Sequence, residues 1–192
     1  NCTLNKMLPI VPPGAGRYTM RLGNLDGGSK AARVVLEFDV TPEVSFFLLN
    51  YAVILEDPAH EYFEQPRFDL YIKNVNGDTL DCGVYRVRAA ETIPGFETCL
   101  SDLRVRPWTS AGFELQSYLG QTIRIEIITT DCSKGGHGGY AYFDATCKPL
   151  ELILDGYCPG SETAKYIIND GFEKYLWNTG ETTNQIIINN PV

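Results

Sequence analysis

The strongest constraint on the fold is a two-residue alternation of apolar and polar side chains that recurs along most of the chain. Side chains two residues apart point to the same face of a β-strand, so each alternating run predicts a strand with one buried face. Such runs include Val34–Val40, Phe68–Lys73 and Ile123–Ile127. No stretch of about twelve residues or more shows the 3.6-residue period of an amphipathic helix. We therefore predict an all-β protein with little helix.

One run differs from the others because it is apolar on both faces. Residues Val44–Leu55 fit a central strand that is covered on each side. Asn76-Gly77 separates two strand-like runs and predicts a tight hairpin, because this dipeptide readily adopts positive φ. Glycine and proline interrupt the chain between short strands, which is typical of a two-sheet, jelly-roll-like β-sandwich.

The pattern restarts near Lys148-Pro149, which predicts two domains. We assign residues 1–148 to the sandwich and residues 149–192 to the start of a second, small β domain. Within the second segment we expect strands at 150–154, 165–168, 174–177 and 185–188. A segment this short has few residues with which to form a hydrophobic core of its own, so we predict a partial domain.

The charge balance restricts the partners. With 16 basic and 24 acidic residues the chain carries a net charge of -8, which disfavours nucleic acid and anionic membrane surfaces because their phosphates would be repelled. Neutral or cationic partners fit better. The longest apolar run falls short of the roughly 20 residues that cross a bilayer, so we expect no membrane insertion.

The six cysteines lack the close paired spacing of zinc or redox motifs, which favours disulfides and an oxidising, extracellular compartment. The pair Cys132–Cys147 brackets a glycine-rich loop and a strand and is the first choice. Cys82–Cys99 is the second, which leaves Cys2 and Cys158. Alternatively, Cys158 pairs with a cysteine in further strands that lie beyond the sequence given.

Enzyme motifs are absent, so we predict a protein that is not an enzyme. The chain has no Gly-x-Ser-x-Gly elbow and no phosphate-binding Gly-x4-Gly-Lys loop. The segment beginning at His60 starts like a zinc-protease motif but has Glu64 where the second histidine should stand. His60 and His137 are the only histidines, too few for a histidine-rich metal centre. Paired carboxylates for glycoside hydrolysis remain an alternative.

Candidate ligand-binding residues gather around the glycine-rich loop. Four glycines surround His137, which is either presented to a ligand or bound to backbone within a tight loop. In the strand that follows, Tyr140, Tyr142 and Asp144 share one face. Two rings beside a carboxylate suit a sugar-binding platform or a calcium site, and the alternative is a solvated outer face. We expect His60 to border the same groove.

Two further sets complete the candidates. Asp144 with Asn24 or Asp26 from an early loop could hold a structural Ca²⁺, because carboxylate and amide oxygens suit this ion. Arg67 could bind a carboxylate or an acidic sugar through both guanidinium nitrogens. We favour a structural role for Arg67, since an arginine at a strand start more often pairs with a neighbouring acid.

Three segments together resemble a known family. Arg21–Asn24, Tyr51–His60 with Gln65–Phe68, and Gly135–Asp144 resemble a β-sandwich module of very large adhesin-like surface proteins that gliding bacteria export through the type IX system. The resemblance covers roughly residues 17–147. Residues 150–192 are similar to the opening strands of the immunoglobulin-like (PKD-like) repeats that follow such modules.

The resemblance implies export, attachment to the cell surface and a jelly roll akin to carbohydrate-binding and MAM-type domains. In those domains an aspartate on the last strand often holds calcium, and Asp144 matches it. One departure is Gly138, which stands where the family commonly has an aromatic residue after the histidine.

We therefore predict a secreted, non-catalytic adhesion module that binds an extracellular glycan or a surface protein, with Ca²⁺ as a structural ion and neighbouring repeats of the same polypeptide beside it. One alternative is a structural spacer within a large adhesin. Another is an accessory carbohydrate-binding domain of a secreted hydrolase.

Overall fold

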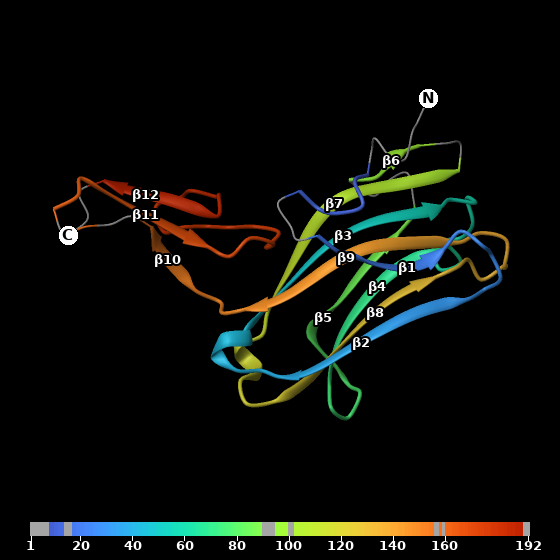
Figure 1. The fold of residues 1–192 in the computed structure, drawn as a ribbon, viewed down its shortest axis with the longest axis horizontal. Helices are drawn as coiled ribbons and strands as arrows, with labels where there is room; N and C mark the ends of the chain where they lie inside the picture. Colours follow the sequence, from blue (N-terminus) through green and yellow to red (C-terminus); the bar gives the residue numbers. More distant parts are fainter. Residues whose placement is uncertain are drawn as a thin grey trace. The chain divides into compact units, whose positions relative to one another are not determined.

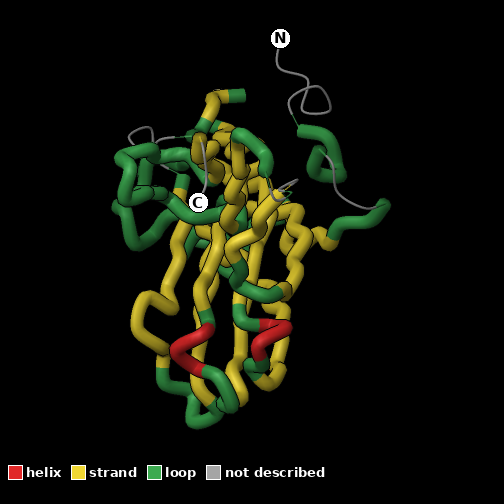
Figure 2. Tube along the Cα trace, turned by 90° about the vertical axis from the view of Figure 1, so that its left-hand side faces the viewer, coloured by secondary structure: helices red, strands yellow, loops and turns green. Residues whose placement is uncertain are grey.

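The structure, a computed structural model, describes residues 8–13, 17–89, 95–99, 102–155, 158 and 160–189. These residues are nearly all in strands and loops, as Figures 1 and 2 show. The helical turns in Figure 2 are two short 3-10 segments, η1 (Pro42–Val44) and η2 (Gln116–Tyr118). No helix in the described ranges has the length and apolar character needed to cross a membrane.

Two antiparallel sheets and a third, smaller sheet make up the fold, which confirms the predicted all-β, jelly-roll-like class. Successive strands repeatedly change sheet along the chain, as the strand order of a jelly roll requires. The first sheet has the order β1 (Met20–Asn24), β9 (Gly139–Lys148), β3 (Phe46–Glu56), β7 (Leu103–Glu114) and β6 (Glu97–Thr98). The second has the order β2 (Ala31–Asp39), β8 (Thr122–Thr130), β4 (Arg67–Asn74) and β5 (Thr79–Arg88). The third has the order β10 (Leu152–Asp155), β11 (Thr163–Ile168) and β12 (Gln185–Asn189).

The central strand is β3, as its sequence predicts. It lies in the middle of the first sheet, and nine of its eleven residues are buried, so both faces are covered. A strand in this position needs apolar side chains at consecutive positions rather than at alternate ones.

The core of the sandwich comes from the inward positions of the alternating strands. In the second sheet Leu70 of β4 pairs with Ile127 of β8, and both side chains are fully buried. The rings of Tyr51 and Phe68 stack with centroids 5.3 Å apart, and the Tyr51 hydroxyl is hydrogen-bonded to that of Tyr85. This confirms that the period-two pattern divides each strand into a core face and an outer face.

The predicted hairpin joins β4 to β5 and is confirmed. Gly77 has a φ of +90°, a conformation that glycine adopts at no steric cost. The side-chain oxygen of Asn74 accepts hydrogen bonds from the backbone N–H groups of Asn76 and Asp78, both at 2.9 Å. The turn is thus closed by an asparagine side chain as well as by backbone.

The chain divides into two compact units. The first comprises described residues up to Asp39, residues 50–109 and residues 121–144. The second comprises residues 40–49, 110–120 and the chain from residue 145. The second unit is therefore larger than the segment after residue 148.

Inside the second unit, two glycines come close together. The N–H of Gly112 donates to the carbonyl of Gly171 at 2.7 Å. The strand predicted at 174–177 is wrong, because this segment forms a loop. Its Trp177 indole N–H donates to the Thr183 carbonyl at 2.8 Å, a local bond that the strand pattern does not reveal.

Both favoured disulfides are wrong, since Cys82, Cys132, Cys147 and Cys158 carry free thiols. Cys132 lies in the loop before β9, whereas Cys147 lies near the other end of that strand. An extended strand rises about 3.4 Å per residue, so β9 holds the two cysteines apart. Cys82 is exposed on β5 of the second sheet, while Cys99 directly follows β6 of the first. Cys99 itself is disulfide-bonded, with a partner other than these four.

Candidate functional site

The loop between β3 and β4 holds His60 in a fixed turn. The buried Asp57 carboxylate accepts hydrogen bonds from the Gln65 amide at 2.9 Å and from the Ala59 N–H at 3.2 Å. Its other oxygen lies 3.0 Å from Nε of Arg104. Ala59 has a φ of +55°, a left-handed conformation that costs energy for a residue with a Cβ. Asp57 thus fixes the backbone before His60, and the Gln65 amide that it holds also donates to the His60 carbonyl at 3.2 Å.

The glycine-rich loop between β8 and β9 carries the other two members of the site. The Cys132 N–H donates to the His137 carbonyl at 2.9 Å, which closes the loop on itself. The Ser133 N–H donates to the Glu64 carbonyl at 3.1 Å, and the Lys134 ammonium lies 2.8 Å from the Glu64 carboxylate. These contacts tie the two loops together.

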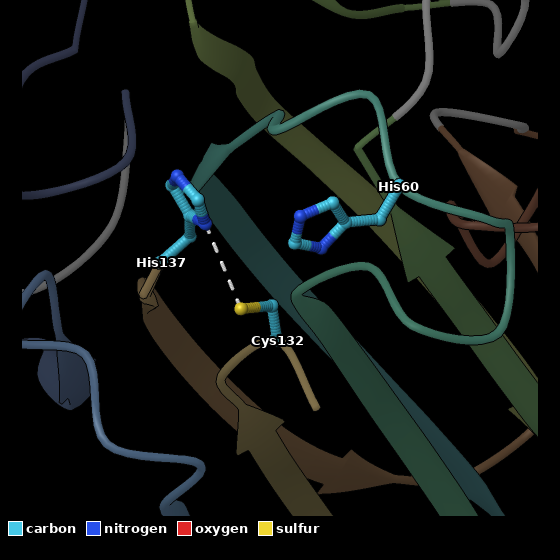
Figure 3. Close-up of side chains that lie close together, drawn as sticks. All are labelled: His60, Cys132 and His137. Carbon is cyan, nitrogen blue, oxygen red and sulfur yellow. Dashed lines mark hydrogen bonds between the residues drawn. The ribbon is translucent and has the colours of Figure 1, made fainter. Parts of the chain in front are cut away.

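Side chains of the two loops converge on one point, shown in Figure 3. His60, Cys132 and His137 each offer a ligand atom, and the three atoms lie within 4.8 Å of one another. Sγ of Cys132 is 3.6 Å from Nδ1 of His137. The two imidazole rings are nearly perpendicular, with centroids 5.4 Å apart. The sequence therefore identified both histidines of this cluster but assigned its cysteine to a disulfide.

The surroundings of the cluster favour a thiolate. Burial alone raises the pKa of the Cys132 thiol, but hydrogen bonds from the His137 side chain and from the backbone N–H groups of Gly136, His137 and Lys134 outweigh it, so the pKa is lowered. Nδ1 of His60 is buried and has no hydrogen-bond partner within the described ranges. A lone buried ring nitrogen is costly, so this atom calls for an explanation.

The two predicted tyrosines lie together but do not form an open platform. The rings of Tyr140 and Tyr142 meet edge to face with centroids 5.7 Å apart, and the Arg21 guanidinium lies 4.2 Å from the centre of the Tyr140 ring. Both tyrosines pack against an apolar cluster that includes Ile54 and Val105. Burial raises the pKa of Tyr140. Much of their ring surface is thus used in packing.

The residues predicted for calcium are not gathered around one point. In the β1–β9 pair Asn24 lies opposite Gly139, and Met20 lies opposite Phe143, the residue before Asp144. At about 3.4 Å per residue, Asp144 is roughly 17 Å from Asn24 along the strand. The Asn24 side chain accepts the Asp26 N–H at 2.9 Å in a local turn. Calcium binding itself stays a prediction, but these three side chains cannot share one ion.

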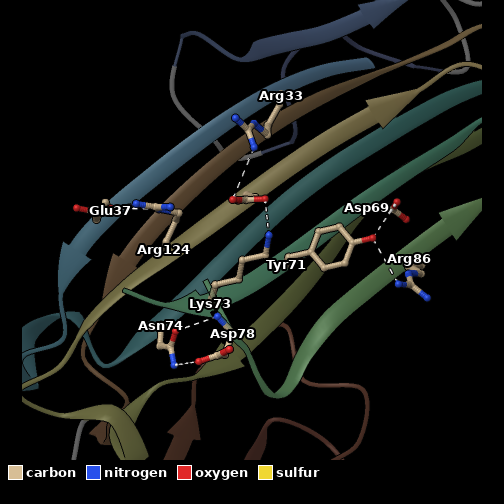
Figure 4. A network of polar contacts seen from close by, with 10 residues as sticks. Arg33, Glu37, Asp69, Tyr71, Lys73, Asn74, Asp78, Arg86 and Arg124 are labelled. Carbon is tan, nitrogen blue, oxygen red and sulfur yellow. Dashed lines mark hydrogen bonds and ion pairs between the residues drawn. The ribbon is translucent and has the colours of Figure 1, made fainter. Parts of the chain in front are cut away.

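A second feature is a network of charges on the outer face of the second sheet, seen in Figure 4. Arg67 pairs with Asp69 at 2.9 Å, as the structural interpretation of this arginine predicts. The Tyr71 hydroxyl donates to the same carboxylate at 3.4 Å, and Arg86 donates to that hydroxyl at 3.4 Å. Across β8, the buried Glu126 carboxylate accepts from Lys73 at 2.9 Å.

Two of the acids on this face lie beneath bases, whereas the Glu37 side chain is 51% exposed and that of its partner Arg124 is 38% exposed. The Asp69 and Glu126 side chains are 2% and 7% exposed, whereas those of Arg67 and Arg33 are 31% and 59% exposed. Exposed Arg86 has no ion-pair partner among the described residues. Around Asp69 and Glu126, solvent therefore meets mostly guanidinium and ammonium groups. We call the outer face of the second sheet the charged face. Its outward positions carry the bases Arg33, Arg67, Lys73, Arg86 and Arg124 and the acids Glu37, Asp69 and Glu126. Arg88, which is 8% exposed, is covered by the β3–β4 loop, where it donates to the Tyr62 carbonyl at 2.8 Å.

No family model matches the chain, and no curated protein does. Among solved structures, the chain is similar to VP2 in the subviral particle of infectious bursal disease virus, with 12% identity, a TM-score of 0.34 and coverage of 68% of this chain and 33% of that one. It is also similar to a protein of an empty virus-like particle of Cowpea Mosaic Virus, with 5% identity, a TM-score of 0.27 and coverage of 74% of this chain and 89% of that one. The chain thus spans about a third of the VP2 chain that it matches.

Proposed function

We propose that this chain is a non-catalytic binding module of a secreted, cell-surface adhesin, and that its charged face binds an acidic glycan. The observation that carries the proposal is the segregation of charge on this face: the carboxylates of Asp69 and Glu126 are buried beneath the more exposed Arg67 and Arg33, in a protein whose net charge is -8. The sequence resemblance to adhesin modules of gliding bacteria supports the export and the surface location. A structural calcium and neighbouring repeats belong to the same proposal.

The chemistry of the charged face fits a polymer of uronic acids. A guanidinium matches a carboxylate through two parallel hydrogen bonds, and among the described residues Arg86 makes only a long hydrogen bond, to Tyr71. The Tyr71 ring lies between Lys73 and Arg86, whose charged groups are 5.4 and 5.6 Å from its centre. An aromatic ring beside cations suits a sugar that has both an apolar face and a carboxylate.

The sheet repeats these groups at regular intervals. Adjacent strands are about 4.8 Å apart, and outward side chains along one strand recur about every 7 Å. Arg67 and Lys73 lie on the outward face of β4, and Arg86 of β5 lies opposite Asp69 between them, so these three cations form an array. An array of this kind suits a ligand that carries one carboxylate on every sugar. The negative charge on the rest of the protein would repel the same polymer, which limits binding to this face.

Binding of polygalacturonate and of its methyl-esterified form tests the proposal, with the affinity of each measured by calorimetry in a buffer containing chelator. The ester keeps the sugar and removes the charge. We expect binding of the acid form only, weakening as salt rises. Arg86→Gln should weaken binding of the acid form about tenfold, which corresponds to the loss of one charge-assisted hydrogen bond. Arg17→Gln replaces an exposed arginine before β1 and should leave this binding unchanged.

Two results would contradict the proposal. Equal binding of the ester would mean that charge is not what is recognised. Absence of binding to either polymer is the result that a structural spacer within a large adhesin predicts.

A further inference from the structure

We infer that His60, Cys132 and His137 form a zinc site that joins the β3–β4 and β8–β9 loops. One thiolate and two imidazoles are the donor types that zinc prefers, whereas calcium and magnesium require oxygen ligands. The site is independent of the charged face and of the acidic-glycan proposal, because it shares no residue with them.

The spacing of the three donors fits this ion. Zinc bonds of 2.0–2.1 Å to nitrogen and 2.3 Å to sulfur place tetrahedral ligands about 3.3–3.6 Å apart. Sγ of Cys132 and Nδ1 of His137 are already 3.6 Å apart. All three donors lie within 4.8 Å of one another, so the widest pair must close by at most about 1.2–1.5 Å. A small rotation of the His60 side chain supplies this movement.

The unpartnered nitrogen of His60 is the second observation. A hydrogen bond between Cys132 and His137 would by itself account for those two residues. It does not account for the buried Nδ1 of His60, which has no partner in the part of the chain that the structure describes. We assign Nδ1 as the His60 ligand, because a metal ion bound there gives this nitrogen a partner and removes the cost of burying it.

The protein around the donors is built to keep them in place. Asp57 fixes the turn before His60 through three contacts, and the Glu64 carbonyl and carboxylate hold the other loop. Backbone N–H groups of residues 134, 136 and 137 are hydrogen-bonded to the sulfur and help to fix its position. No further imidazole, thiol or carboxylate of the described residues joins the three, which leaves one tetrahedral position for water.

Cobalt titration tests the inference, because a thiolate bound to Co²⁺ gives a near-ultraviolet charge-transfer band and a tetrahedral site gives visible bands. The purified protein is titrated anaerobically without reductant, so that the disulfide of Cys99 is kept. We expect both signals at one ion per chain and their loss when Zn²⁺ is added.

Variants assign the ligands. Cys132→Ser should abolish the charge-transfer band. His60→Gln should weaken metal binding by about 100-fold or more, because loss of a residue that only hydrogen-bonds to a ligand already weakens binding by about 10–100-fold. Cys147→Ser, a free cysteine outside the cluster, is the matched control and should retain both signals. His60 is only partly buried, so His60→Gln should fold, and circular dichroism checks this for each variant.

Three results would overturn the inference. They are a charge-transfer band that survives in Cys132→Ser, metal binding by folded His60→Gln equal to that of the wild type, and no cobalt spectrum in the wild-type protein.

Discussion

Replacement of Asp57 by alanine should destabilise the protein by about 3–5 kcal/mol, the cost of breaking a buried ion pair from one side. Asp57 and Arg104 are 7% and 8% exposed, and their charged atoms are 3.0 Å apart. At an effective dielectric constant of about 20, the Coulomb energy of unit charges at this distance is roughly 5 kcal/mol. The variant leaves the Arg104 guanidinium buried without this carboxylate, and it also removes the hydrogen bonds to Ala59 and Gln65.

Urea unfolding followed by circular dichroism measures this change, since the free energy of unfolding falls linearly with urea. Asp81→Ala removes an exposed aspartate from β5 and should change stability by less than about 0.5 kcal/mol. In a double-mutant cycle, Asp57→Ala combined with Arg104→Ala should cost less than the sum of the two single changes. A loss below about 1 kcal/mol, or strict additivity, would refute the argument that this pair holds the His60 loop.

Three further changes test other parts of the structure. Gly138→Ala places a Cβ 2.7 Å from the Asn24 carbonyl oxygen, so urea unfolding should show a loss of about 1–3 kcal/mol, and an unchanged stability would contradict this close approach. Ile125→Ala opens a cavity at a fully buried position and should cost about 2–5 kcal/mol by the same assay, whereas a loss below about 1 kcal/mol would place Ile125 outside the core. In metal-free protein the pKa of the Cys132 thiol is lower in the folded state than its unfolded value near 8.5. The Cys132 thiolate therefore contributes its full stabilisation above about pH 8.5, and this stabilisation is lost as the pH falls through the folded pKa. The stability difference between wild type and Cys132→Ser should therefore grow as the pH rises, and a pH-independent difference would argue against a thiolate.

The sequence predicts most of the fold because strand patterning is local. Alternation identified the core faces of β2, β4 and β8, and the unbroken apolar run identified β3 as the central strand. The hairpin at Asn76-Gly77 followed from turn chemistry. The strand expected at 174–177 failed because the indole of Trp177 finds a carbonyl partner six residues further on, and such a bond leaves no periodic signal.

The candidate sites were less predictable because they depend on which loops meet. His60 and His137 are 77 positions apart, and only the folded sandwich brings their rings to 5.4 Å. Cys132 was assigned to a disulfide from its neighbours in sequence, although β9 carries Cys147 away from it. The charged face was hidden because a net charge does not report that acids are buried and arginines exposed. The alternation on β4 of buried apolar residues with Arg67, Asp69, Tyr71 and Lys73 is the signal that could have revealed it.

Mapping of a galacturonate oligosaccharide onto the protein by backbone amide NMR tests the central claim most directly. Chemical-shift changes should concentrate on β4 and β5 around Tyr71 and Arg86, with smaller changes on β8 and β2. Changes confined to the loops around His137 and Tyr140, or a spectrum that does not respond to the oligosaccharide, would contradict it.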